Sequence, residues 1–148
     1  RVVAAGNSCG GITSLALAGQ DARVKSVFVL SGSSVGPGAT REDAAAIMDK
    51  VTVPVGFVVG GPEDIASDQA DQDYDLLSAG LAAMVVKRAS ADHRTVSTDP
   101  DMLSDAAEIG VNWMNATLYG DQQAVSSLNE KACTQCKDGL WSVKTKNL

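Results

Sequence analysis

The sequence contains few of the residues on which metal, disulfide and nucleic-acid chemistry depend. Its 148 residues include one histidine and three cysteines, and the 12 lysines and arginines are outnumbered by 18 acidic residues. Three cysteines do not make a framework of several disulfides, and phosphate binding needs clustered lysine and arginine side chains. The net charge of −6 therefore argues against nucleic acid or an anionic membrane as a partner.

Long hydrophobic runs are also missing. A membrane-spanning helix needs about 20 consecutive apolar residues, whereas the stretches SVFVL and VPVGFVVG have the length of single strands. We therefore expect no membrane segment. The sequence shows no signal peptide, but residue 1 already lies in an expected strand, so any leader would precede it. A secreted and a cytoplasmic location both remain open.

The pattern of apolar residues predicts one α/β domain over residues 1–148. Uninterrupted apolar strands that alternate with helices indicate a parallel sheet with helices on both faces. In the helix near the end of the chain, Ile109, Trp113 and Ala116 are expected on one buried face, and Thr40 is expected to cap an earlier helix. The tail over 132–148 is expected to be irregular. Strands are predicted at residues 2–5, 24–30, 53–59 and 81–87, and helices at 11–19, 41–50, 65–77 and 103–118.

The stretch Gly6-Asn7-Ser8-Cys9-Gly10 lies between the first strand and the first helix. A G-x-S-x-G motif between a strand and a helix is typical of a nucleophile elbow, a sharp turn that holds a serine above the sheet. Flanking glycines relieve the crowding of the strained backbone there. Ser8 is therefore the candidate nucleophile, and the backbone N–H of Cys9 is the candidate donor to an oxyanion.

Two other interpretations of the glycine-rich turns are less consistent with the sequence. A second copy of the motif, Gly32-Ser33-Ser34-Val35-Gly36, also follows a strand, but Pro37 and Gly38 come next and no helix begins at once. Ser8 is therefore favoured over Ser34. A nucleotide-binding turn is disfavoured because the first motif lacks G-x-G-x-x-G spacing and no acidic residue ends the following strand.

A serine nucleophile needs a base and a group that orients the base. The single histidine, His93, follows the fourth expected strand, and Asp64 follows the third in VVGGPEDIA. The order Ser8, Asp64, His93, with each residue after its own strand, is that of α/β-hydrolases. Asp64 is preferred as the acid, and Glu63, Asp68 and Asp92 are the other candidates.

Taken together, these motifs make the chain resemble the C-terminal half of an α/β-hydrolase, and more narrowly a dienelactone-hydrolase-like or esterase-like protein. The resemblance rests on GNSCGG, GGPEDIA, NWMNATLYGD, CTQC and WSVKTKNL, and it extends over nearly all 148 residues. It implies a Ser8–His93–Asp64 triad that acts on an ester or related small acyl substrate, with no metal and no organic cofactor. The alternative is a hydrolase-like binding or interaction protein without catalytic activity.

The resemblance also implies strands before residue 2, because hydrolases of this class have several strands ahead of the elbow and take a second oxyanion donor from them. Without such strands, the strand at 2–5 has an unpaired edge, which natural domains avoid. We therefore expect an N-terminally incomplete domain, whose sheet edge an N-terminal chain or a second copy of this chain covers.

The remaining motifs leave alternatives open. Cys133 and Cys136 form a C-x-x-C, for which a local disulfide and two free thiols are equally expected, while a zinc site or a thioredoxin-like site lacks the required surroundings. Asn115 begins a glycosylation triplet, which matters only in a secreted eukaryotic protein.

Overall fold

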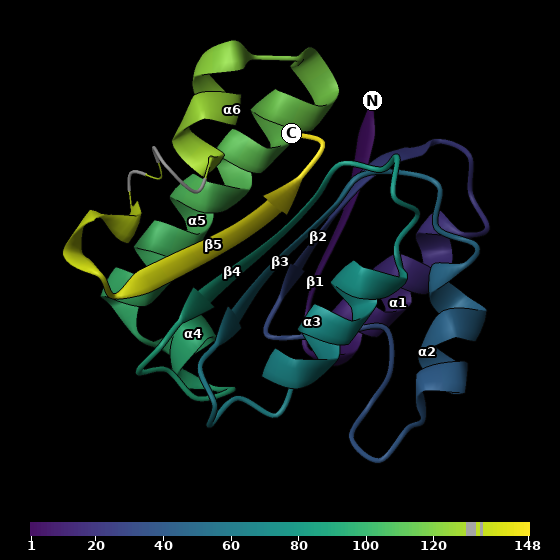
Figure 1. Ribbon diagram of the computed structural model, residues 1–148, viewed down its shortest axis with the longest axis horizontal. Coiled ribbons are helices and arrows are strands. Elements are labelled where there is room, and N and C mark those ends of the chain that lie inside the picture. Colours follow the sequence, from purple (N-terminus) through teal and green to yellow (C-terminus); the bar gives the residue numbers. More distant parts are fainter. Residues whose placement is uncertain (130–132, 134) are drawn as a thin grey trace.

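A computed structural model describes residues 1–129, 133 and 135–148 (Figure 1). Its centre is a five-stranded sheet in the order β1-β2-β3-β4-β5. The first four strands are parallel, whereas β5 pairs antiparallel with β4. The predicted α/β class is confirmed, but the prediction of a purely parallel sheet is wrong, because the sheet is mixed. The strands are β1 (Val2–Asn7), β2 (Val24–Leu30), β3 (Val55–Gly60), β4 (Ala83–Arg88) and β5 (Trp141–Lys146).

Strand β5 lies in the segment 132–148, which the sequence predicted to be irregular. Residues 132 and 134 are outside the described residues, but Trp141–Lys146 is regular and pairs with the whole of β4. Val143 lies opposite Val86, and Trp141 is buried in the core on one face of the sheet. An edge strand needs an apolar residue only at every second position, which explains why the polar sequence WSVKTK can form one.

The helices cover both faces of the sheet, as predicted (Figure 1). Helices α1 (Cys9–Ala18), α2 (Arg41–Met48) and α3 (Ser67–Leu76) pack on one face. On the other face lie α4 (Thr95–Thr98), α5 (Pro100–Met114) and α6 (Gln122–Leu128). The π-helix η1 (Asn115–Tyr119) continues α5, and the 3-10 helix η2 (Gln135–Asp138) precedes β5.

Local signals in the sequence explain where two helices begin. Thr40 caps α2 as predicted: its side chain accepts a hydrogen bond from the Asp43 backbone N–H, and the Asp43 carboxylate accepts one from the Thr40 backbone N–H. Helix α5 begins three residues before the predicted start, because Asp99 caps it and Pro100 occupies its first position. Proline is well suited to that position, since it has no N–H that would need an acceptor.

The helical face predicted for α5 is confirmed, because Ile109, Trp113 and Ala116 are all buried. Trp113 packs over the sheet and donates its indole N–H to the carbonyl oxygen of Val27 at 2.9 Å. A Cβ at position 56 would lie 2.9 Å from the Trp113 ring. Glycine at position 56 therefore lets the indole lie directly against β3.

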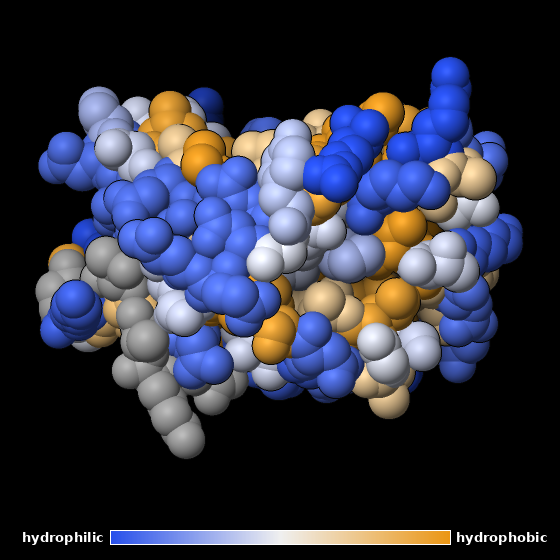
Figure 2. All heavy atoms as spheres, turned by 90° about the horizontal axis from the view of Figure 1, so that it is seen from above, coloured by the Kyte–Doolittle hydropathy of each residue, from blue (hydrophilic) through white to orange (hydrophobic). Residues whose placement is uncertain are grey.

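Figure 2 shows one face of the molecule, on which hydrophilic side chains surround smaller exposed hydrophobic patches. Among the described residues, no helix combines the length and the apolar character that crossing a membrane requires. The carboxyl ends of β1 to β4 all lie at one edge of the sheet, because these strands are parallel. The loops that follow them therefore meet in one place, and they carry Ser8, Ser31, Asp64 and His93.

Candidate functional site

Ser8 occupies a sharp turn between β1 and α1. Its backbone has φ 51° and ψ −119°, which is a strained conformation for a residue with a side chain. Two hydrogen bonds hold the turn: the Ser8 N–H donates to Leu30 O at 2.9 Å, and the Gly11 N–H donates to Ser8 O at 2.8 Å. The strain persists because the sheet on one side and the helix on the other both fix this residue.

The two glycines of the motif differ in what they contribute. A Cβ at Gly6 would lie 2.2 Å from the backbone carbon and oxygen of Gly10, so only glycine allows α1 to begin so close to β1. A Cβ at Gly10 would meet no described atom within 4 Å. The expectation that both glycines relieve crowding is therefore correct for Gly6 and wrong for Gly10.

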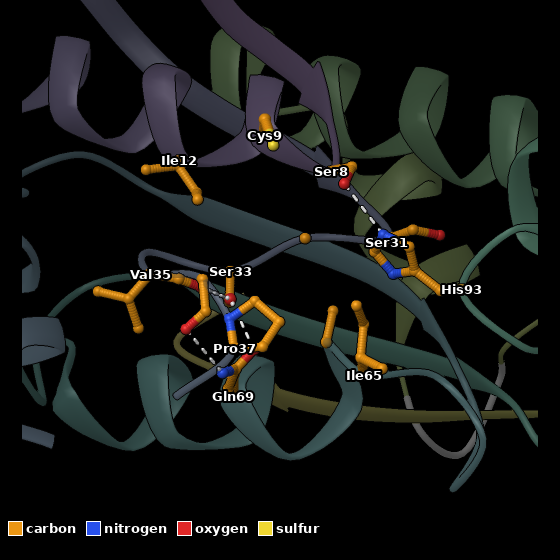
Figure 3. Close-up of a pocket in the computed structure, with 13 residues that line it drawn as sticks. Ser8, Cys9, Ile12, Ser31, Ser33, Val35, Pro37, Ile65, Gln69 and His93 are labelled. Atoms are coloured by element: carbon orange, nitrogen blue, oxygen red, sulfur yellow. Dashed lines mark hydrogen bonds between the residues drawn. The ribbon is translucent and has the colours of Figure 1, made fainter. Parts of the chain in front are cut away.

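The three residues predicted for the site form one chain of hydrogen bonds. Ser8 Oγ lies 2.9 Å from His93 Nε2, and His93 Nδ1 lies 2.7 Å from Asp64 Oδ1. With the imidazole protonated on Nδ1, Nε2 accepts from the serine hydroxyl and Nδ1 donates to the carboxylate. The contacts predicted among Ser8, His93 and Asp64 are thus present in the structure (Figure 3 shows the first of them).

Asp64 is fully buried and oriented by the backbone around it. Its Oδ2 accepts the Gly60 N–H at 2.7 Å, and its Oδ1 accepts the Ala66 N–H at 2.9 Å as well as the bond from His93. The side chain of Asp64 has no solvent exposure, whereas that of His93 is 24% exposed. A buried carboxylate with three N–H donors is held in one orientation, and it faces an imidazole that a substrate can reach.

The other acidic candidates do not bond to His93. Glu63 is exposed on the same loop as Asp64, and Asp68 is exposed in the first turn of α3. The Asp92 carboxylate accepts hydrogen bonds from the Arg94 and Thr95 backbone N–H groups and from the Thr95 hydroxyl, at 2.6 to 2.9 Å. These bonds, chiefly the one from the Thr95 side chain, lower the pKa of Asp92. Asp92 therefore shapes the turn that carries His93 instead of orienting its ring.

A pocket opens beside the Ser8 hydroxyl and the His93 ring (Figure 3). Its walls come from the start of α1, from the loop after β2 and from the start of α3. The pocket has a volume of about 60 Å³. It is lined by Ser8, Cys9, Ile12, Ser31, Gly32, Ser33, Val35, Gly36, Pro37, Ile65, Ala66, Gln69 and His93.

The loop after β2 is fastened to α3 by polar bonds that the sequence analysis missed. The buried Ser34 donates its hydroxyl to Asp73 Oδ1 at 2.6 Å and its backbone N–H to Asp73 Oδ2 at 2.5 Å. The Gln69 side chain donates to Gly36 O and accepts from the Ser33 hydroxyl. Ser34, the alternative nucleophile, is thus a structural residue, and burial raises the pKa of Asp73 to about 6.

Ser31 is also a residue of the site, and the sequence did not predict it. It directly follows β2, lines the pocket together with Ser8 and His93, and has φ 43°. Its side chain is fully buried, and its hydroxyl has no hydrogen-bond partner among the described residues. A strained backbone and an unpaired buried hydroxyl both cost stability. Ser31 precedes the motif Gly32-Ser33-Ser34-Val35-Gly36, and nothing in the sequence distinguishes it from Ser33 and Ser34.

The side chains of the cysteines and of Asn115 take no part in the hydrogen-bonded chain from Ser8 to Asp64. Cys133 and Cys136 form a disulfide, with their Cα atoms 5.2 Å apart, and Asn115 begins the π-helix η1. Cys9 is a free, exposed cysteine at the first position of α1. Within the described part of the chain, no cluster of histidine, cysteine, aspartate or glutamate side chains could hold a metal ion.

The geometry of Ser8, His93 and Asp64 is therefore the main basis for assigning a function. Comparison with protein-family models and with curated proteins finds no match to this chain.

Proposed function

We propose that the protein is a serine hydrolase of the α/β-hydrolase class that cleaves carboxylic esters or related acyl substrates. The observation that carries the proposal is the continuous chain from Ser8 Oγ through His93 to the buried Asp64, with contacts of 2.9 and 2.7 Å. Nucleophile, base and orienting acid in this arrangement form the constellation that activates a serine for acyl transfer.

In the first step, Ser8 Oγ attacks the carbonyl carbon of the ester. The serine proton passes to His93 Nε2, a bond forms between Oγ and carbon, and the π electrons of the carbonyl move to its oxygen. Asp64 accepts the Nδ1–H and stabilises the positive charge on the imidazolium. The tetrahedral intermediate then collapses, and the alcohol leaves with the proton from His93.

In the second step, a water molecule hydrolyses the acyl-enzyme by the same series of proton transfers and bond changes. His93 takes a proton from the water, the oxygen attacks the acyl carbon, and Ser8 leaves with that proton. The negative oxygen that forms in each step is stabilised by the Cys9 N–H. Cys9 is the first residue of α1, and N–H groups in the first turn of a helix have no partner within the helix and carry partial positive charge.

A fluorophosphonate probe tests the proposal, because it reacts covalently with activated serines. We expect labelling of Ser8, located by peptide mass spectrometry, and its loss in Ser8→Ala. Ser34→Ala is the matched control, since Ser34 lies in the second G-x-S-x-G copy but is tied to Asp73, and it should be labelled like the wild type. Asp64→Asn should lower kcat for ester hydrolysis by about 10⁴-fold. An unlabelled wild-type chain would favour a non-catalytic binding protein.

A further inference from the structure

Apolar side chains form much of the wall of the pocket beside Ser8, and no aspartate, glutamate, lysine or arginine lines it. Figure 3 shows Ile12 of α1, Val35 and Pro37 of the loop after β2, and Ile65 before α3 arranged around the opening. Among the residues that line the pocket, His93 and Cys9 are the only ones with an ionisable side chain. The polar groups Ser33 and Gln69 already bond to the loop.

A substrate with a carboxylate in its acyl part would meet no arginine or lysine in the pocket lining, and the hydroxyl of Ser31 is a single neutral donor. Carboxylates in protein sites are recognised by arginine, lysine or several N–H donors, and burying one without a partner is costly. Arg94 follows His93 in the chain but does not line the pocket. The net charge of −6 adds a long-range repulsion of anions.

Ile65 marks the side of the pocket that is open to solvent. Its side chain is 59% exposed although it is large and apolar, while the next residue, Ala66, is buried. An isolated exposed isoleucine needs no explanation, but this one belongs to the pocket wall together with Ile12 and Val35. An apolar acyl chain between these side chains would cover part of the exposed surface of Ile65, which favours binding.

The volume limits the length of the acyl chain. The pocket has about 60 Å³, whereas an apolar cavity of about 150 Å³ admits benzene. A chain of the size of butyryl fits this space, and the end of a much longer chain would extend into solvent. We infer that the pocket beside Ser8 selects esters whose acyl part is short, apolar and uncharged, and that it rejects acyl groups ending in a carboxylate. This inference rests on the proposed function.

Two ethyl esters of equal acyl length test the charge selection. Ethyl butyrate and ethyl hydrogen succinate differ in the terminal group, which is a methyl in one and a carboxylate in the other, and ethanol release reports both reactions. We expect kcat/KM for the butyrate to be higher by on the order of 100-fold, the effect of leaving a charge without a partner. Ethyl octanoate should show no gain in kcat/KM over the butyrate, because its additional methylenes extend into solvent and make no further contact with the pocket.

Two arginine variants, one in the pocket wall and one outside the pocket, test the effect of a positive charge. Ile65→Arg should lower the butyrate-to-succinate ratio about tenfold by supplying the missing partner. Leu17→Arg is the matched control, because Leu17 is an exposed residue of α1 that does not line the pocket, and it should leave the ratio unchanged. A similar fall in both variants would assign the selection to overall charge and overturn the pocket as its cause.

The outcomes separate this inference from the proposed function. Equal rates on butyrate and succinate, or a preference for octanoate of about tenfold or more, would overturn the inference while leaving the hydrolase intact. Labelling of Ser8 by the fluorophosphonate probe without hydrolysis of ethyl butyrate would do the same. Absence of both labelling and hydrolysis would overturn the proposed function itself.

Discussion

Ser31 combines two unfavourable features at the scale of a single residue. Its φ of 43° is in the left-handed region, and its buried hydroxyl has no partner among the described residues. Left-handed backbone costs a residue with a side chain about 1–2 kcal/mol, and a buried unpaired hydroxyl costs about 1–3 kcal/mol. Such costs concentrate at functional sites, and Ser31 lines the pocket with Ser8 and His93.

We therefore expect Ser31→Gly to stabilise the fold. Glycine adopts the left-handed region freely and removes the hydroxyl, and these gains exceed the roughly 0.5–1 kcal/mol that glycine costs in entropy. The free energy of unfolding, measured by urea denaturation, should rise by about 1–2 kcal/mol. Ser31→Ala removes only the hydroxyl and should give a smaller gain. A glycine variant less stable than the wild type would contradict this account.

Asp73 leads to a prediction about pH. Burial raises its folded-state pKa from 3.8 to about 6, against the opposing hydrogen bonds from Ser34. Between pH 4 and pH 6 the folded protein therefore holds a proton at Asp73 that the unfolded chain has lost, so the contribution of Asp73 to stability falls as pH rises through this window. The difference corresponds to roughly 2–3 kcal/mol.

Asp73→Asn should remove this fall, since an amide stays neutral while its oxygen accepts from the Ser34 N–H and its NH₂ donates to the Ser34 hydroxyl. We expect the stability of the variant, relative to the wild type, to increase between pH 4 and pH 6 in urea denaturation. The exposed Asp68→Asn on the same helix serves as control and should keep the wild-type pH dependence. Parallel curves for Asp73→Asn and the wild type would show that burial of Asp73 carries no such penalty.

The residues of the site differ in how far the sequence could predict them. Ser8, Asp64 and His93 could be predicted because each follows its own strand, and parallel strands end at one edge of the sheet. Ser31 and Asp73 could not, because their states depend on burial and on neighbours distant in the chain. The sequence alone does not distinguish serines that lie next to a glycine, because burial and hydrogen-bond partners are set by the packing.

At the scale of the element, the turn from β1 into α1 depends on Gly6. A Cβ there would lie 2.2 Å from the Gly10 backbone, and backbone on both sides leaves no flexible atom to move. Gly6→Ala should therefore destabilise the protein by about 1–3 kcal/mol or more and displace Ser8 from His93. Thermal denaturation and fluorophosphonate labelling measure these two effects separately.

Gly10→Ala is the matched control for Gly6→Ala, since the added Cβ would meet no described atom within 4 Å beyond its chain neighbours and the backbone of its own helix. Position 10 lies in the first turn of α1, where alanine is favoured over glycine by up to about 1 kcal/mol. Gly10→Ala should therefore keep its labelling and lose no stability. Equal losses in both variants would mean that the motif requires glycine for another reason than the approach of α1 to β1.

Buried elements were easier to predict than edge elements. Strands β2, β3 and β4 lie inside the sheet, and their uninterrupted apolar runs are visible in the sequence. β5 lies at the edge, and its polar residues Lys144 and Lys146 hide its pattern. The pairing of β5 with β4 is set by contacts across the sheet, which a local pattern does not contain.

At the scale of the whole molecule, the two edges of the sheet differ in charge. β5 carries Lys144 and Lys146, and lysines on an edge strand discourage pairing with another chain. β1, with the sequence VVAAGN, carries no charged side chain and pairs only with β2 among the described residues. Val2 at its start is 49% exposed, and Leu17 of the adjoining α1 is also exposed. The β1 edge is therefore the one open to strand pairing.

We expect the chain to self-associate through the β1 edge, which is one of the two alternatives, a second copy or an N-terminal chain, that the sequence leaves open. Ala5→Lys places a charge at an exposed position of β1 and should shift size-exclusion elution towards the monomer at micromolar concentration, because pairing would bury the ammonium group. Ala22→Lys changes the net charge equally at an exposed position outside the strands and should elute like the wild type. A wild-type chain that elutes as a sharp monomer at all concentrations would show that the β1 edge does not recruit a partner strand. Equal shifts in elution for both lysine variants would show that the association depends on net charge and would contradict a specific role of the β1 edge.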